Sequence, residues 1–154
     1  MQFLQSTTSE INAQSKLALV KEVTHSPKRA PCLARLNDRN ERSLFSKLRL
    51  GTLKLEVETG RHEKPKIDHS KRFCNSDKIG NECHFLFDCP SLQSTRKPLL
   101  ENIIKTHPHL THLSSEEKAK YLFFNNHIDN PTLLLVSNLA RELFEKRNKL
   151  INEI

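Results

Sequence analysis

The chain has 154 residues, a formal net charge of +7, no tryptophan and a hydrophobic fraction of 36%. This length suits a single domain with a thin aliphatic core, and no stretch approaches the roughly 18 apolar residues of a membrane-spanning helix. The first residues are too polar for a secretory signal peptide, which argues against a disulfide-rich extracellular protein. We therefore expect an intracellular protein, nuclear or cytoplasmic, with no membrane attachment and with reduced cysteines.

With only 3 glycines and few β-branched runs, the sequence favours helices. We predict a mainly α fold, in which a flexible N-terminal arm precedes a small helical domain with one irregular segment. The arm comprises residues 1–39, which are polar and partly disordered, with one short helix from about Glu10 to Glu22. The helical domain comprises residues 40–154, and its irregular segment is 72–90.

The first helix of the domain is expected to begin near Glu41, because Asn40 is a favourable N-cap residue. Gly51 would kink or end this helix. Its apolar residues recur at three- and four-residue spacing, which predicts one buried face and a cationic surface elsewhere. These residues are Leu44, Phe45 and Leu48, with Leu53 and Leu55 continuing the pattern.

Residues 60–73 contain a glycine, a proline and several basic side chains, which predicts an extended or looped connection. The excess of basic over acidic residues lies entirely in the first two thirds of the chain. Such a surface can bind phosphate backbones, although simple solvation is its commoner role. If the chain binds RNA or DNA, the phosphate contacts that we expect are Arg61, Lys64, Lys66, Lys71 and Arg72.

Two more helices are indicated after the irregular segment. Pro90 suits the first turn of a helix, which Pro98 would break in two. Ser114 and Glu117 have the spacing of a capping box, which predicts a helix that begins there and stops at about Asn125.

The last predicted helix covers residues 131–152 and begins at Pro131. Its apolar stripe predicts either a helix that faces the core or one that docks on a partner protein, and the core is the commoner place for such a stripe. The stripe comprises Leu134, Leu135, Leu139, Leu143, Phe144, Leu150 and Ile151.

Three of the four cysteines and one histidine lie between Cys74 and Cys89. Thiolate and imidazole are preferred ligands of Zn²⁺, and the gap of four residues between His84 and Cys89 lets one turn of backbone bring both to one ion. We predict Cys74, His84 and Cys89 as ligands of one Zn²⁺, with Asp77 or Cys83 as the fourth. The alternative is that the thiols of Cys83 and Cys89 are buried apolar groups and that no metal binds.

The cysteine cluster belongs to a longer series of motifs between residues 41 and 97. The series consists of a helix with a Leu-Arg pair, then Gly60-Arg61, Pro65, Arg72-Phe-Cys74, Glu82-Cys-His84-Phe-Leu-Phe-Asp-Cys89-Pro90 and Arg96. In this order it resembles the region downstream of the polymerase in non-LTR (LINE, jockey-like) retrotransposon reverse transcriptases, which carries a CCHC zinc-knuckle-like motif. Relative to that pattern about three residues are missing before His84, so that Cys74 stands for two cysteines.

The resemblance implies a non-catalytic fragment of a reverse transcriptase polyprotein that uses a metal-stabilised motif to hold RNA or DNA. The sequence contains nothing similar to the paired aspartates that bind magnesium in a polymerase, nor a glycine-rich phosphate loop, so we expect no enzymatic activity. Two alternatives stay open. The chain could be a helical protein-interaction module that uses residues 131–152, or a relic with no selected activity.

Overall fold

The computed structural model describes residues 31–55, 74, 80–125 and 127–153. Within these residues every regular element is a helix and there is no strand, which confirms the predicted mainly α class. Residues 1–30 of the predicted arm, with the helix expected at Glu10 to Glu22, lie outside the described residues, as does the predicted connection 60–73. None of the described helices combines the length and the apolar character needed to cross a membrane.

The described elements are five α-helices, two 3₁₀ turns and one π turn. In chain order they are α3 (Pro31–Arg35), α4 (Arg39–Arg49), the π turn η2 (His84–Asp88), the 3₁₀ turn η3 (Pro90–Leu92), α6 (Gln93–Thr106), the 3₁₀ turn η4 (Pro108–His112), α7 (Ser115–Phe124) and α8 (Asn130–Asn152).

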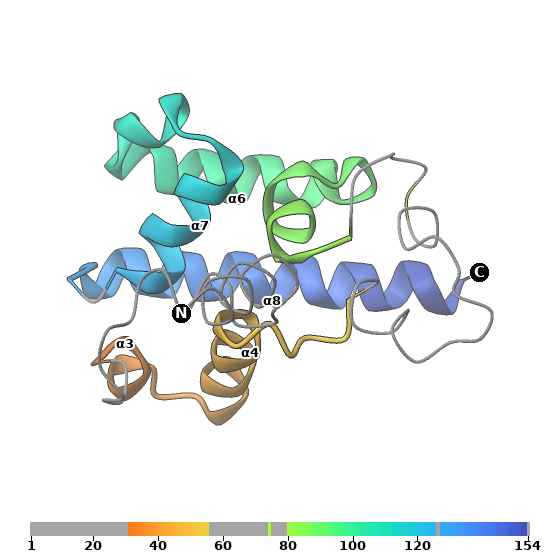
Figure 1. Ribbon diagram of the computed structural model, residues 1–154, viewed down its shortest axis with the longest axis horizontal. Coiled ribbons are helices and arrows are strands. Elements are labelled where there is room, and N and C mark those ends of the chain that lie inside the picture. The colour runs from red at the N-terminus through yellow and green to blue at the C-terminus, as the bar shows by residue number, and fades with distance from the viewer. Residues whose placement is uncertain (1–30, 56–73, 75–79, 126, 154) are drawn as a thin grey trace, which may run out of the picture.

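Helix α8 is the centre of the packing, with α6 along one side and α4 on the other (Figure 1). The colour order shows that the chain runs in opposite directions in α6 and α8. Leu139 and Leu143 of α8 are fully buried, and Phe45 of α4 stacks on Phe123 of α7 with ring centroids 5.0 Å apart. Five of the seven residues of the apolar stripe lie in the core or pack against it, whereas Leu134 and Ile151 are 56% and 39% exposed.

The packed part of the chain begins earlier than residue 40. Cys32 of α3 and Leu36, both inside the predicted arm, are each 1% exposed and belong to the core. Arg49 of α4 reaches back to this segment and donates to Cys32 Sγ at 3.3 Å and to the Phe123 carbonyl at 2.6 Å. The sequence did not indicate this because α3 is too short to show a period.

Helix α4 begins and ends for identifiable reasons. Asp38, and not Asn40 as predicted, is its N-cap, because its side chain accepts a hydrogen bond from the backbone N–H of Glu41 at 2.9 Å. The helix ends before Gly51, which has φ of 61°, a left-handed conformation that glycine adopts without steric cost. The predicted end at Gly51 is thus confirmed.

Helix α6 is continuous through Pro98, so the prediction that this proline would break the helix was wrong. The proline is exposed, so its ring points to solvent and the residue costs a backbone hydrogen bond without disturbing the core. On the other side of the helix, the fully buried Ile103 holds α6 in the core. Packing therefore outweighs the local preference.

The capping box of α7 is confirmed: Glu117 N–H donates to Ser114 Oγ at 3.2 Å, and Ser114 N–H donates to Glu117 Oε2 at 2.8 Å. The helix ends at Phe124, as predicted from the asparagines that follow. Helix α8 has Pro131 in its first turn and ends at Asn152, also as predicted.

Asp129 caps α8, since its carboxylate accepts from Thr132 N–H and Thr132 Oγ1, both at 2.8 Å. These bonds hold the pKa of Asp129 below its usual range. A lowered pKa stabilises the fold above the unfolded-state pKa of about 3.9 and ceases to do so as the pH falls through the folded-state value. We expect Asp129→Ala to lower the free energy of unfolding by about 1 kcal/mol at neutral pH, in urea titrations followed by circular dichroism. The deficit should shrink in acid, whereas Asp129→Asn, which keeps an acceptor, should lose less.

Candidate metal centre

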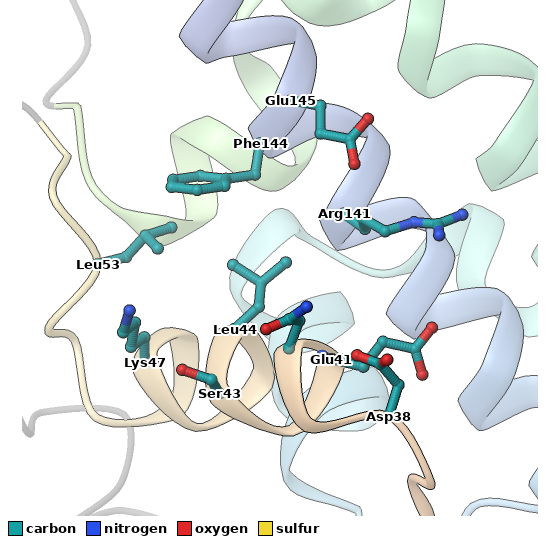
Figure 2. A pocket seen from close by; sticks show the side chains of 10 residues that line it. Asp38, Glu41, Ser43, Leu44, Lys47, Leu53, Arg141, Phe144 and Glu145 are labelled. Atoms are coloured by element: carbon teal, nitrogen blue, oxygen red, sulfur yellow. Dashed lines mark hydrogen bonds between the residues drawn. The ribbon is translucent and has the colours of Figure 1, made fainter.

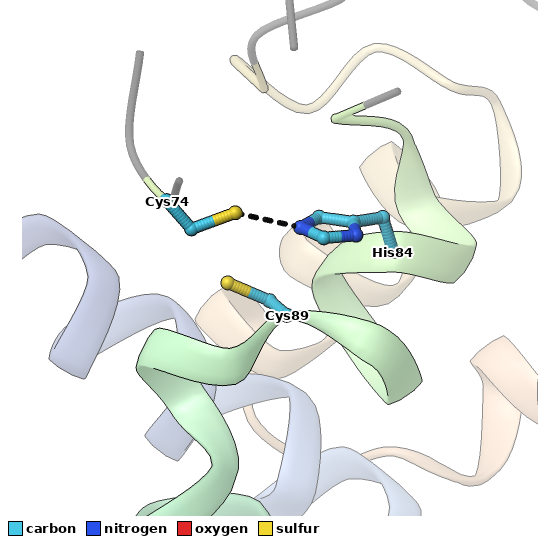
Figure 3. A group of neighbouring side chains, drawn as sticks. All are labelled: Cys74, His84 and Cys89. Atoms are coloured by element: carbon cyan, nitrogen blue, oxygen red, sulfur yellow. Dashed lines mark hydrogen bonds between the residues drawn. The ribbon is translucent and has the colours of Figure 1, made fainter. Parts of the chain in front are cut away.

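Three side chains that can ligate a metal converge at one buried point. They are Cys74, His84 and Cys89, and their ligand atoms all lie within 4.8 Å of one another. Figure 3 shows the two sulfurs and the imidazole facing a common space. All three side chains are at least nine-tenths buried, with exposed fractions of 8%, 5% and 1%. This group could hold a metal ion.

The π turn η2 places two of the three ligands. Its closing hydrogen bond runs from the Cys89 N–H to the His84 carbonyl at 2.7 Å, five residues back along the chain. In an α-helix, residues five apart point about 140° away from each other, because each residue turns the chain by about 100°. The wider π turn reduces this angle, so His84 and Cys89 can face the same point. Single π turns are rare in proteins, but those that occur are frequently found at functional sites.

Polar contacts fix both ends of this turn. Asn81 Oδ1 accepts from the His84 N–H at 2.9 Å, and the Asn81 carbonyl accepts from the Phe85 N–H at 2.9 Å, so Asn81 caps the helical residues 82–83 that lead into η2. At the other end, Ser115 Oγ donates to Asp88 Oδ1 at 2.7 Å and ties the turn to α7. The His84 and Cys89 positions are therefore held by the scaffold and not only by each other.

Cys74 completes the group from a different part of the chain. Its Sγ lies 3.0 Å from His84 Nε2, and the two share a hydrogen bond (Figure 3). Two ligands of one tetrahedral zinc ion lie about 3.3–3.8 Å apart, since zinc bonds to nitrogen and sulfur measure about 2.0–2.3 Å. A rearrangement of about 1 Å would therefore fit the trio around one ion, and two sulfurs with one imidazole are a donor set that zinc prefers.

The surroundings of Cys89 act on its charge in both directions. Burial raises the pKa of its thiol to about 11, and the neighbouring Cys74 adds to the rise. The backbone N–H groups of Ser91 and Leu92 lie near the sulfur and lower the pKa, which acts against the rise. A metal ion would favour the thiolate far more strongly, because it replaces the proton with a divalent charge.

Neither candidate for a fourth ligand is part of the described group. Cys83 is half-buried, and burial raises the pKa of its thiol to about 11 with the help of the acidic residues Glu116, Glu82 and Asp88. It is excluded from the converging trio. Asp77 lies outside the described residues, and so do the predicted phosphate contacts Arg61, Lys64, Lys66, Lys71 and Arg72.

Sequence reasoning did not foresee the supporting contacts of Asn81 and Arg96. Arg96 of α6 is 3% exposed, and its Nη2 donates to the Cys89 carbonyl at 2.8 Å. The asparagine could have been found, since an Asn three residues before His84 has the spacing of a helix cap. The arginine was visible only as a member of the motif series, with no role attached.

A separate groove lies between α4 and the C-terminal half of α8 and encloses about 510 Å³ (Figure 2). Its apolar part consists of Leu44, Leu53 and Phe144, and Glu145 and Lys47 are among its charged lining residues. It contains none of the three metal-ligating side chains, so it is distinct from the metal centre.

No protein-family model, curated protein or solved structure matches this chain.

Proposed function

We propose that this chain is a non-catalytic, nucleic-acid-binding module in which Cys74, His84 and Cys89 hold one Zn²⁺. The ion would tie Cys74 to the π turn and to the start of α6, and so fix the segment that carries the basic residues. Its chemistry would be structural, since it would cross-link thiolates and an imidazole that are distant in sequence.

One observation supports the metal above all others. The three side chains that the sequence indicated as ligands meet at one buried point, although His84 lies ten positions after Cys74 in the sequence. Two thiols and an imidazole brought together in this way are a donor set that zinc prefers.

The proposed partner is RNA or single-stranded DNA. Its support is the resemblance of residues 41–97 to the post-polymerase region of non-LTR retrotransposon reverse transcriptases, together with the basic excess in the first two thirds of the chain. From the same residues we infer that this chain descends from such a polyprotein. The basic residues between Gly60 and Cys74 would contact phosphates, and the metal centre would set the direction in which they leave the domain.

The metal content of the purified chain tests the proposal. We expect one equivalent of zinc per chain by elemental analysis after dialysis under reducing conditions. Cys89→Ser should abolish it, because removing one of three ligands destroys the site. Cys83→Ser is the matched control and should keep the zinc. A folded chain that contains no zinc and takes up none when it is added would contradict the metal centre.

A further inference from the structure

Arg96 touches the metal centre without being a ligand. It lies in the first turns of α6, and its Nη2 donates to the Cys89 carbonyl at 2.8 Å and to Gln93 Oε1 at 2.6 Å. The Cys89 carbonyl belongs to the residue that ends the π turn and begins the path into η3. The guanidinium therefore fixes the peptide group between Cys89 and Pro90, and with it the backbone that carries the Cys89 side chain.

The charge of Arg96 is buried near Cys89. Burial lowers the pKa of its guanidinium, while Cys89 and Asp88 act in the opposite direction. Both acidic groups are therefore near enough to interact with the cation. Arg96 Nη1 is buried and has no hydrogen-bond partner among the described residues. A guanidinium with an unused donor is costly to bury.

We propose that Arg96 is a positioning residue of the metal centre, which orients Cys89 through its carbonyl and places a fixed positive charge beside the thiolate ligands. This inference rests on the proposed metal function. Two thiolates and a neutral imidazole cancel the charge of a Zn²⁺ ion, but each sulfur keeps much of its negative charge. A nearby cation and the backbone N–H groups of Ser91 and Leu92 stabilise that charge, as outer contacts of metal ligands commonly do.

Cobalt titration of the full-length chain tests the inference. Co²⁺ occupies zinc sites and reports thiolate ligation by its absorption. We expect Arg96→Gln to weaken Co²⁺ affinity by about 10–100-fold, the usual effect of losing an outer contact of a metal ligand. Arg96→Lys should restore most of the affinity, because it keeps the charge and several donors on one nitrogen. A structural contact alone would not distinguish the two variants in this way.

A matched control separates this role from general destabilisation. Arg49 is also a buried arginine that donates to a sulfur and to a carbonyl, but it lies at Cys32 and Phe123. Arg49→Gln should leave Co²⁺ affinity unchanged in the folded chain. Gln93→Ala alters an exposed side chain and removes the second anchor of Arg96, so it should weaken binding by a smaller factor than Arg96→Gln.

The outcomes are distinct. The role of Arg96 would be overturned, with the metal centre left intact, if Arg96→Gln bound Co²⁺ as tightly as the unaltered chain. An equal loss of Co²⁺ affinity in Arg49→Gln would overturn it too. If Arg96→Gln does not fold even with metal, an unchanged affinity in Gln93→Ala overturns it instead. Absence of Co²⁺ binding by the unaltered chain would refute the proposed metal function, and this inference with it.

Discussion

Removal of the proposed zinc ion is expected to lower both the free energy of unfolding and the melting temperature of this chain. Metal that binds only the folded state adds about 4 kcal/mol when its free concentration is 1,000 times its dissociation constant. The ion would join Cys74 to the π turn. Without the ion, the fold would lose this cross-link while the polar ligand atoms stayed buried. Thermal denaturation with excess zinc and with a chelator, both under reducing conditions, measures the difference.

Substitutions identify the origin of that difference. Cys89→Ser should melt at the temperature of the chelated chain and should not respond to zinc. Cys83→Ser should behave as the unaltered chain does, because Cys83 is adjacent to His84 in sequence but outside the converging group. Equal melting temperatures of the unaltered chain with and without zinc would argue that the trio is only part of the core.

The helices were predictable where the signal is local. The capping box of Ser114 and Glu117 and the proline start of α8 depend on residues three or four apart, so they can be found in the sequence. Pro98 was misjudged because the outcome depends on which side of α6 faces solvent. The burial of Cys32 was missed because α3 has five residues and shows no period, and because its contact with Arg49 lies seventeen residues further along the chain.

The candidate site divides in the same way. Residue types and spacing indicated Cys74, His84 and Cys89, since few side chains ligate soft metals and three of them cluster here. The means by which they converge was not predictable: a π turn between His84 and Cys89 depends on how the turn packs against α7 and α8. The contact of Arg96 with Cys89 depends on the same packing.

The second large effect concerns nucleic-acid binding. Replacing Arg61, Lys64, Lys66, Lys71 and Arg72 with glutamine should abolish most of the affinity for single-stranded RNA at low salt. Each phosphate contact on a single strand contributes about 0.7 to the slope of log affinity against log salt concentration, so losing five contacts should reduce the slope by about 3.5. Fluorescence anisotropy with a labelled oligonucleotide, titrated at several salt concentrations, gives both quantities.

A control with the same change in net charge decides whether the position of these residues matters. Five of the exposed or half-buried basic side chains of helices α6, α7 and α8 serve as this control: Lys105, Lys118, Arg141, Lys146 and Lys149. Replacing these five with glutamine should leave most of the affinity and most of the slope, if binding occurs through the basic segment beside Cys74. An equal loss in both variants would indicate a diffuse effect of net charge. The absence of salt-dependent binding by the unaltered chain would contradict the nucleic-acid function.

Repeating the titration with Cys89→Ser connects the two parts of the proposal. A metal that orients the basic segment should raise affinity without changing the number of phosphate contacts, so this variant should bind more weakly with an unchanged salt slope.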